Sequence, residues 1–285
     1  MRPLDKLPPP AWNDYSDTAA IPLGDAAVHL ADALGDYCSL CEMRLGSDLI
    51  VHHKLRQATP ETVRKADWPD LLLICHDCHR HMSRHSITPE ERGDYLWPDT
   101  DPSFTLHGDS PLIYRLRPVP YIVVDGDARE TSTREFVFAE ANPAADLELQ
   151  RKAANTIALF QLNSPYYDAA SHTLLLSRAE HMQVPCNRLQ QRTLAWTKAA
   201  ASVDRIRRMR ALPEAREHPG LVELLRQQIT HTANAKGNWS VWMTHFWQEF
   251  GEKDLLARAF LERPEDNPGF HFPGTHHERL RWEAL

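Results

Sequence analysis

Four of the five cysteines form two Cys-x-x-Cys pairs, Cys38/Cys41 and Cys75/Cys78. Such a pair makes a knuckle, a tight turn that presents two thiolates to one metal ion. Two knuckles supply four thiolates, which complete a tetrahedral shell, and zinc is the ion that such a closed sulfur site prefers. The four cysteines therefore predict a structural zinc site without an open coordination position. The alternative is four reduced thiols that bind no metal.

Two histidines lie between the knuckles in the sequence, and a third follows the second knuckle. His52 and His53 follow the apolar run 49–51, and His79 follows the second knuckle directly. Because neighbouring residues of a strand point to opposite faces, a strand that ends or bulges here would aim one imidazole at a metal and the other at a water. An imidazole also suits a general base, since its reference pKa of about 6.5 lies near neutral pH. Together the histidines predict a second, open metal site.

The sequence around these residues resembles the HNH endonuclease motif. The strings YCSLCE, WPDLLLICHDCH and LWPDTD are more narrowly similar to the HNH nuclease subunit of Septu-type and retron-associated anti-phage systems. The opening MRPLDK and the later AANTIALFQLN are similar to the same group. The likeness covers residues 1–180 loosely and residues 36–80 specifically. It implies hydrolysis of DNA phosphodiester bonds by a small ββα-metal module.

The resemblance implies a role for each matched residue. His52 and His79 would hold one catalytic divalent ion, which is Mg²⁺, Mn²⁺, Ni²⁺ or Zn²⁺. His53 would act as the general base, and Asp70 takes the place of the family's middle asparagine, where it or a backbone carbonyl would accept the second N–H of His53. The subfamily usually has glutamate and asparagine where this chain has His52 and His79. Two imidazoles suit transition metals better than Mg²⁺.

Basic residues and further histidines near the second knuckle extend the candidate site. Arg56, Arg80 and Arg84 are candidates to contact phosphate, and each can also be an ordinary surface charge. His81 and His85 are four residues apart on one predicted helix, so either could supply a third ligand to the catalytic ion. A solvated helix face is the alternative for this pair.

The elements that must position these residues indicate an α+β fold that is mostly α, with a small zinc-stapled ββα-metal (HNH) module on a larger helical body. Helical periodicity and proline positions predict helices at 26–35, 145–163, 165–182, 186–211, 213–235 and 238–262, and strands at 121–127 and 135–140. The predicted domains are an N-terminal arm and short helix (1–35), the HNH module (36–86), a turn-rich connection with a β-hairpin (87–141) and a helical domain (142–285).

Composition and charge limit where this protein can act and what it can bind. No window approaches the roughly eighteen apolar residues of a membrane span, and the N-terminus lacks the order of a signal peptide, so we expect a cytoplasmic protein without a membrane partner. The net charge of −7 disfavours strong intrinsic DNA binding. The basic region 188–216 is most simply a solvated helix face. The resemblance implies DNA as substrate and an ATPase subunit as gating partner. The alternative is a catalytically inactive zinc-binding scaffold or nucleic-acid-binding module.

Overall fold

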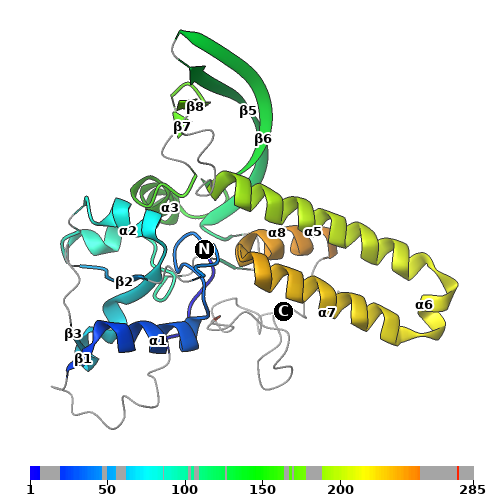
Figure 1. Ribbon diagram of the computed structural model, residues 1–285, viewed down its shortest axis with the longest axis horizontal. Coiled ribbons are helices and arrows are strands. Elements are labelled where there is room, and N and C mark those ends of the chain that lie inside the picture. The colour runs from blue at the N-terminus through cyan, green and yellow to red at the C-terminus, as the bar shows by residue number, and fades with distance from the viewer. Residues whose placement is uncertain are drawn as a thin grey trace.

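The computed structural model describes residues 1–6, 20–46, 50–55, 62–85, 87–101, 104–105, 109–125, 127–163, 167–168, 170–177, 188–250 and 275. These residues form a mixed α+β structure in which helix is the most abundant element, so the predicted α+β class is confirmed. Figure 1 shows a region of short elements near the N-terminus, a long β-ribbon that projects from it, and a protruding pair of antiparallel helices.

The first helix, α1 (Leu23–Leu34), lies where the sequence predicts one, and it begins three residues before the predicted start at 26. It ends at Gly35, whose φ of 75° is a backbone conformation that favours glycine. Its buried residues share one face because they are spaced four apart, and that face packs against β4. They are Ala26, Leu30 and Leu34.

Two short antiparallel strand pairs and one helix surround the cysteine and histidine residues. Register in the second pair runs from Ile50 opposite Ile74 to His53 opposite Leu71. The strand of this pair that leads into the second knuckle is buried along its whole length, which explains its uninterrupted apolar sequence LLLI. The elements are β1 (Ala20–Pro22) paired with β3 (Thr62–Arg64), β2 (Ile50–His53) paired with β4 (Leu71–Ile74), the 3₁₀ helix η2 (Lys65–Asp70), and α2 (His76–Met82).

The long ribbon is the β5–β6 hairpin of a four-stranded sheet whose strand order is β6-β5-β8-β7. The hairpin of β5 (Leu112–Asp125) and β6 (Ala128–Ala141) is much longer than the two strands that the sequence predicts. The predicted helix over 165–182 is wrong, because β7 (Tyr167–Asp168) and β8 (Thr173–Ser177) occupy that stretch. The apolar run of β8 pairs in parallel with β5, and such a short run has no periodicity that separates a strand from a helix.

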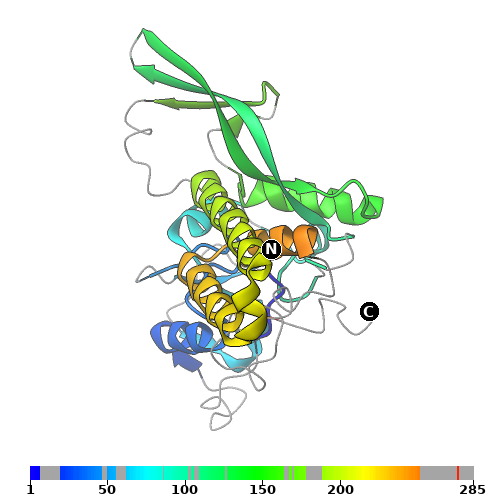
Figure 2. The ribbon, with the colours of Figure 1, turned by 90° about the vertical axis from the view of Figure 1, so that its right-hand side faces the viewer.

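The helical part follows the hairpin. Its predicted helix over 213–235 is divided at Pro219 into two helices, and the remaining predicted helix ends are within a few residues of the observed ones where the structure describes them. Figures 1 and 2 show α5 and α7 side by side and antiparallel, with α6 closing the far end and α8 packed against α5 at the other end. The helices are α3 (Leu147–Leu159), α5 (Arg188–Ala211), α6 (Pro213–Glu217), α7 (Pro219–Lys236) and α8 (Trp239–Phe250).

One hydrophobic core joins the metal-site region to the helices. It contains Cys38 from the first knuckle and Trp242 from α8, both at most 1% exposed. A β4 residue such as Leu72 and an α5 residue such as Val203 belong to the same cluster. The knuckles therefore rest on the helical body. Within the described part of the chain, no helix combines the length and apolar character needed to cross a membrane.

Candidate metal centre

The four cysteines converge on one point. The Sγ atoms of Cys38, Cys41, Cys75 and Cys78 all lie within 4.8 Å of one another. Two of the separations are 3.6 Å (Cys38 to Cys78) and 3.7 Å (Cys41 to Cys75). Four sulfurs at about 2.3 Å from a tetrahedral zinc ion are about 3.8 Å apart. The predicted cluster is therefore confirmed, and its geometry fits a structural metal such as zinc.

Local hydrogen bonds shape each knuckle. The N–H of Cys41 donates to Sγ of Cys38 over 3.5 Å, and the N–H of Cys78 donates to Sγ of Cys75 over 3.4 Å. Cys75 is also the N-cap of α2, so the second knuckle and the helix start are the same piece of backbone. The N–H of Ser39 donates to the carbonyl oxygen of Leu73 over 2.8 Å. This bond ties the first knuckle to β4, which leads into the second.

An arginine from the helical part completes the surroundings of the cysteines. Nη2 of Arg188, at the start of α5, donates to Sγ of Cys78 over 3.2 Å, and the residue is only 4% exposed. Its Nη1 donates to the carbonyl oxygens of Phe160 and Gln161. Burial lowers the pKa of Arg188, but the four neighbouring cysteines outweigh burial and raise it above its usual value. The guanidinium therefore stays charged beside the thiolates.

The expected solvated face over 188–216 is wrong for the first two arginines. Arg188 and Arg192 are buried, at 4% and 2% exposed. The other basic side chains that the structure describes there are exposed, as the sequence predicts: Lys198, Arg205, Arg207, Arg208 and Arg210. The signal that identifies the first two is the apolar period of α5, because they lie on its buried stripe with Ala195 and Ala199.

The first knuckle is held from its other side by the start of α8. The carboxylate of Glu42 accepts from the N–H of Ser240 and from its hydroxyl, both over 2.7 Å. The carbonyl oxygen of Glu42 accepts from the N–H of Asn238 over 2.8 Å. Backbone at Gly237 approaches so closely that a Cβ there would lie 2.4 Å from the same carbonyl oxygen. The knuckle therefore docks on the turn between α7 and α8.

His52 and His79 come together as the sequence predicts. His52 lies on β2 and His79 on α2, and their Nδ1 atoms are 3.3 Å apart, with the rings at 76° to each other. Two nitrogens bound to one metal at about 2.0–2.1 Å lie roughly 3.0–3.4 Å apart, depending on the coordination angle. Burial, followed by the nearby His79 and His53, lowers the pKa of His52 to about 4, so its imidazole is neutral near pH 7. The pair therefore fits two ligands of one ion.

Ser83 sets the tautomer of His79. The Ser83 hydroxyl donates its only proton to the carbonyl oxygen of His79 over 2.8 Å. Its oxygen lies 3.2 Å from Nε2 of His79, so it accepts the N–H of that ring nitrogen. Nδ1 of His79 then carries a lone pair directed at His52. This is the arrangement of a metal-binding histidine whose other nitrogen is held by a hydrogen bond.

The carboxylate beside His53 comes from Asp67. Nε2 of His53 lies 4.0 Å from Oδ1 of Asp67, while its Nδ1 accepts from the N–H of Leu55 over 3.3 Å. These contacts place the ring proton on Nε2, facing the carboxylate. Asp70, the predicted partner, directs its carboxylate to Arg92 at 2.8 Å. Its carbonyl oxygen accepts from the N–H of Lys54 over 2.9 Å, so Asp70 holds the backbone just after His53.

A buried charge cluster that the residue patterns above do not predict supports this loop. Oδ2 of Asp99 lies 2.6 Å from Nζ of Lys54 and 2.5 Å from Nζ of Lys6. Both ammonium groups also donate to the carbonyl oxygen of Pro69 in η2. Lys54 lies over the ring of Trp97, 5.5 Å from its centroid. The strings MRPLDK and LWPDTD contain three of these residues and are the signal that could have located the cluster.

The remaining candidates do not join the histidine pair. Arg80 pairs with Asp77 at 2.9 Å, Arg84 is exposed, and Arg56 lies outside the described residues. His81 is buried, and Nδ1 of exposed His85 lies 2.9 Å from the carbonyl oxygen of His81. In the part of the chain that the structure describes, the four cysteines are the only group of three or more His, Cys, Asp or Glu that converges. Neither His81 nor His85 therefore completes a three-residue site.

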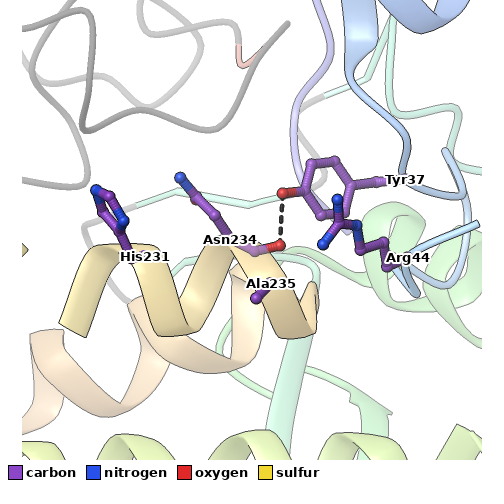
Figure 3. A pocket seen from close by; sticks show the side chains of 5 residues that line it. All are labelled: Tyr37, Arg44, His231, Asn234 and Ala235. Carbon is purple, nitrogen blue, oxygen red and sulfur yellow. Dashed lines mark hydrogen bonds between the residues drawn. The ribbon is translucent and has the colours of Figure 1, made fainter. Parts of the chain in front are cut away.

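A separate polar hollow opens between the first knuckle and α7 (Figure 3). Tyr37 reaches across it, and its hydroxyl donates to the carbonyl oxygen of Asn234 over 2.6 Å. The other residues that line it are Arg44, His231 and Ala235. None of the predicted site residues lines this hollow, so it is distinct from the histidine pair.

Comparison with known proteins adds no assignment. None of the protein-family models, curated proteins or solved structures compared with this chain matches it. Any function must therefore be argued from the residues and geometry of the site itself.

Proposed function

We propose that this protein is a metal-dependent endonuclease of the HNH type that hydrolyses DNA phosphodiester bonds. The observation that carries the proposal is the 3.3 Å separation of the Nδ1 atoms of His52 and His79. His52 lies on β2, which pairs with β4, and His79 lies on α2, which follows β4 directly. A zinc ion bound by four thiolates has no open position, so its role would be to clamp the first knuckle to the β4–α2 junction and thereby fix the strand and helix that carry the histidines.

The proposed chemistry divides the work between two pairs of residues. A divalent ion (Mg²⁺, Mn²⁺, Ni²⁺ or Zn²⁺) bound by His52 and His79 would stabilise the negative charge that develops on the phosphate. His53 would take a proton from the attacking water at Nδ1, in a substrate complex in which the hydrogen bond from the N–H of Leu55 has broken. The carboxylate of Asp67, 4.0 Å from Nε2, would stabilise the imidazolium that forms. Asp67 thus takes the orienting role that the sequence suggests for Asp70.

Substrate and partner contacts extend the same proposal. Arg84 is exposed just beyond α2 and, of the two candidate arginines that the structure describes, is the better placed to contact a phosphate, because Arg80 is already paired with Asp77. The likeness to anti-phage nuclease subunits adds an ATPase partner that gates the activity in the cytoplasm. A net charge of −7 fits a nuclease that depends on a partner for recruitment to DNA.

The test is cleavage of plasmid DNA by the purified, zinc-loaded full chain with Mg²⁺, Mn²⁺, Ni²⁺ or Zn²⁺, with and without the ATPase partner. We expect metal-dependent cutting that is lost in His53→Ala while zinc content and thermal stability are unchanged. His218→Ala, an exposed histidine on the helical hairpin, is the matched control and should cut normally. Absence of cutting with every metal and with the partner present would reject the nuclease.

One observation favours a second candidate, a zinc-binding scaffold without activity. Nδ1 of His53 already accepts from the N–H of Leu55, and the side chain is only 5% exposed. A general base must meet its water, so either water reaches this ring in the substrate complex or the site is inactive. The scaffold predicts the same zinc content and stability but equal, background cleavage for the wild type and His53→Ala.

A further inference from the structure

The outer edge of β6 is exposed over residues 128–135. β6 is the end strand of the sheet β6-β5-β8-β7, and every side chain from Ala128 to Glu135 is exposed. Figure 1 shows this part of the ribbon projecting away from the helices, with the outer side of β6 facing away from β5. An end strand presents a row of unpaired backbone N–H and C=O groups, which another extended chain can bind.

Side chains of α5 and of the segment after α3 cover the C-terminal half of the same edge of β6. The N–H groups of Val137 and Ala139 donate outward to Thr193 Oγ1 and Asn163 Oδ1, over 2.9 and 2.8 Å. The carbonyl oxygens of the same two residues accept from Arg192 Nη1 and Asn163 Nδ2. Side chains therefore satisfy the backbone groups of this edge at Val137 and Ala139. At residues 128–135, on the N-terminal side of Val137, no backbone partner on this edge is found among the described residues.

The register identifies which residues present their backbone groups outward. The register pairs β5 with β6 without interruption, so every second residue of β6 points its backbone N–H and C=O away from β5. Val137 and Ala139 are two such residues, and the others follow at every second position before them. Pro118 and Pro120 of β5 lie opposite Glu135 and Thr133. Because proline has no N–H, these pairs must be the non-hydrogen-bonded ones, which agrees with the phase. The outward residues of the exposed half are Arg129, Thr131, Thr133 and Glu135.

The sequence of the exposed edge is complementary to itself. Residues 129–135 read RETSTRE. When two copies run antiparallel with Ser132 opposite Ser132, Arg129 faces Glu135 and Glu130 faces Arg134, each twice. Thr131 then faces Thr133. Opposite charges and Thr–Thr pairs directly across an antiparallel pair are favourable, and like charges are unfavourable.

Neighbouring registers lack this match. Only shifts of an even number of positions keep outward groups opposite outward groups. One such shift sets Asp127 opposite Glu135, which are like charges. The other sets Arg129 opposite Val137, whose outward groups are already bonded to Thr193 and Arg192. Charge complementarity therefore selects one register out of the possible ones.

We propose that this chain forms a homodimer through the β6 edge at residues 129–135, in the register that is centred on Ser132. The dimer forms about eight backbone hydrogen bonds between the copies, from the four outward residues of each. It joins the two four-stranded sheets into one continuous sheet. The occupant of the edge is a second copy of this chain, and the proposal is independent of whether the histidine pair is catalytic.

The first test is the molar mass of the full, zinc-loaded chain by sedimentation velocity across a micromolar concentration series. We expect a concentration-dependent monomer–dimer equilibrium. Arg134→Glu sets Glu130 opposite a second acid at both ends and should raise the dissociation constant by about tenfold or more. The double variant Glu130→Arg/Arg134→Glu exchanges the two charges and should restore the dimer. Arg205→Glu, an exposed arginine of α5 with the same charge change, should have no effect.

A second test reports the register directly. Opposing residues of a non-hydrogen-bonded antiparallel pair have Cα atoms about 4.5 Å apart, within the range of a disulfide. Ser132→Cys should therefore give a covalent dimer with oxidised glutathione. Glu130→Cys should not, since its copies lie four residues out of register, about 14 Å apart along the strands. A wild-type chain that stays monomeric at all concentrations, a dimer that Arg134→Glu leaves intact, or equal crosslinking of both cysteine variants would overturn the proposal.

Discussion

Nη2 of Arg188 donates to Sγ of Cys78 over 3.2 Å, which links the first residue of α5 to the second knuckle. A zinc ion held by the four thiolates would carry two net negative charges, and this guanidinium would offset one of them. The other half of the guanidinium binds the carbonyl oxygens of Phe160 and Gln161, just after α3. One side chain therefore connects the metal cluster with two helices of the body.

Arg188→Met should lower the free energy of unfolding by about 3 kcal/mol, because it leaves a buried charge and two carbonyl oxygens without their partner. Urea unfolding of the zinc-loaded protein measures the change. Arg205→Met removes the same charge from an exposed position of α5 and should change stability by no more than about 0.5 kcal/mol. Equal stability of the two variants would show that the contact with Cys78 contributes nothing.

Cys75→Ser should abolish tight zinc binding while it keeps the N-cap of α2. A serine hydroxyl can still accept from the N–H of residue 78, as the Cys75 sulfur does. The loss of one thiolate ligand should lower both the zinc content of the purified protein and its melting temperature. Elemental analysis and a thermal melt measure the two quantities. Zinc added back after chelation should restore the wild type and leave the variant unchanged.

Asp67→Asn and Asp70→Asn should separate the two acidic residues of η2 if the nuclease proposal is correct. Asp67→Asn removes the carboxylate that faces Nε2 of His53 and should slow cleavage at least about tenfold. Asp70→Asn breaks the ion pair with Arg92 and should cost about 1 kcal/mol of stability with little change in rate. Plasmid cleavage and thermal melts of both variants decide between them. The reverse order of rates would return the orienting role to Asp70.

Gly237→Ala should be strongly destabilising. Its φ of +69° is unfavourable for alanine, and the added Cβ would lie 2.4 Å from the carbonyl oxygen of Glu42. We expect a loss of at least about 2 kcal/mol from backbone strain and displacement of the first knuckle. Gly220→Ala, in the first turn of α7 with no atom within 4 Å of the added carbon, is the control and should be neutral or stabilising. Similar melting temperatures for both variants would contradict this account.

Asp99 should make the protein lose stability in acid. Burial alone raises the pKa of Asp99, but the ammonium groups of Lys6 and Lys54 together lower it below its usual value. A carboxyl whose pKa is depressed in the folded state contributes stability above its unfolded pKa of about 3.9. That stability is lost as the pH falls through the lower, folded pKa. Chemical unfolding from pH 6 downward should therefore show a shallower acid dependence for Asp99→Asn, and identical slopes would remove Asp99 as the cause.

The sequence by itself determines the local chemistry. Each knuckle is a turn of four residues in which the second cysteine's N–H donates to the first cysteine's sulfur. Because these contacts are local, the spacing of Cys38/Cys41 and Cys75/Cys78 is enough to predict both knuckles. The same holds for α1, whose buried residues recur at helical spacing up to Gly35. The resemblance to the HNH motif predicts that His52 and His79 lie together, and the pairing of β2 with β4 is what brings His52 close to the start of α2.

The tertiary structure alone decides the partners that lie far away in the chain or depend on exact backbone rotation. Arg188 is 110 residues from Cys78, and no local pattern brings them together. In the short helix η2, Asp67 and Asp70 are only three residues apart, and the orientation of the helix in the folded protein decides that Asp67, and not Asp70, faces His53. The segment Thr173–Ser177 forms a strand because β5 and β7 pair with its two edges. Long-range packing determines these features, and the local residue pattern carries little information about such packing.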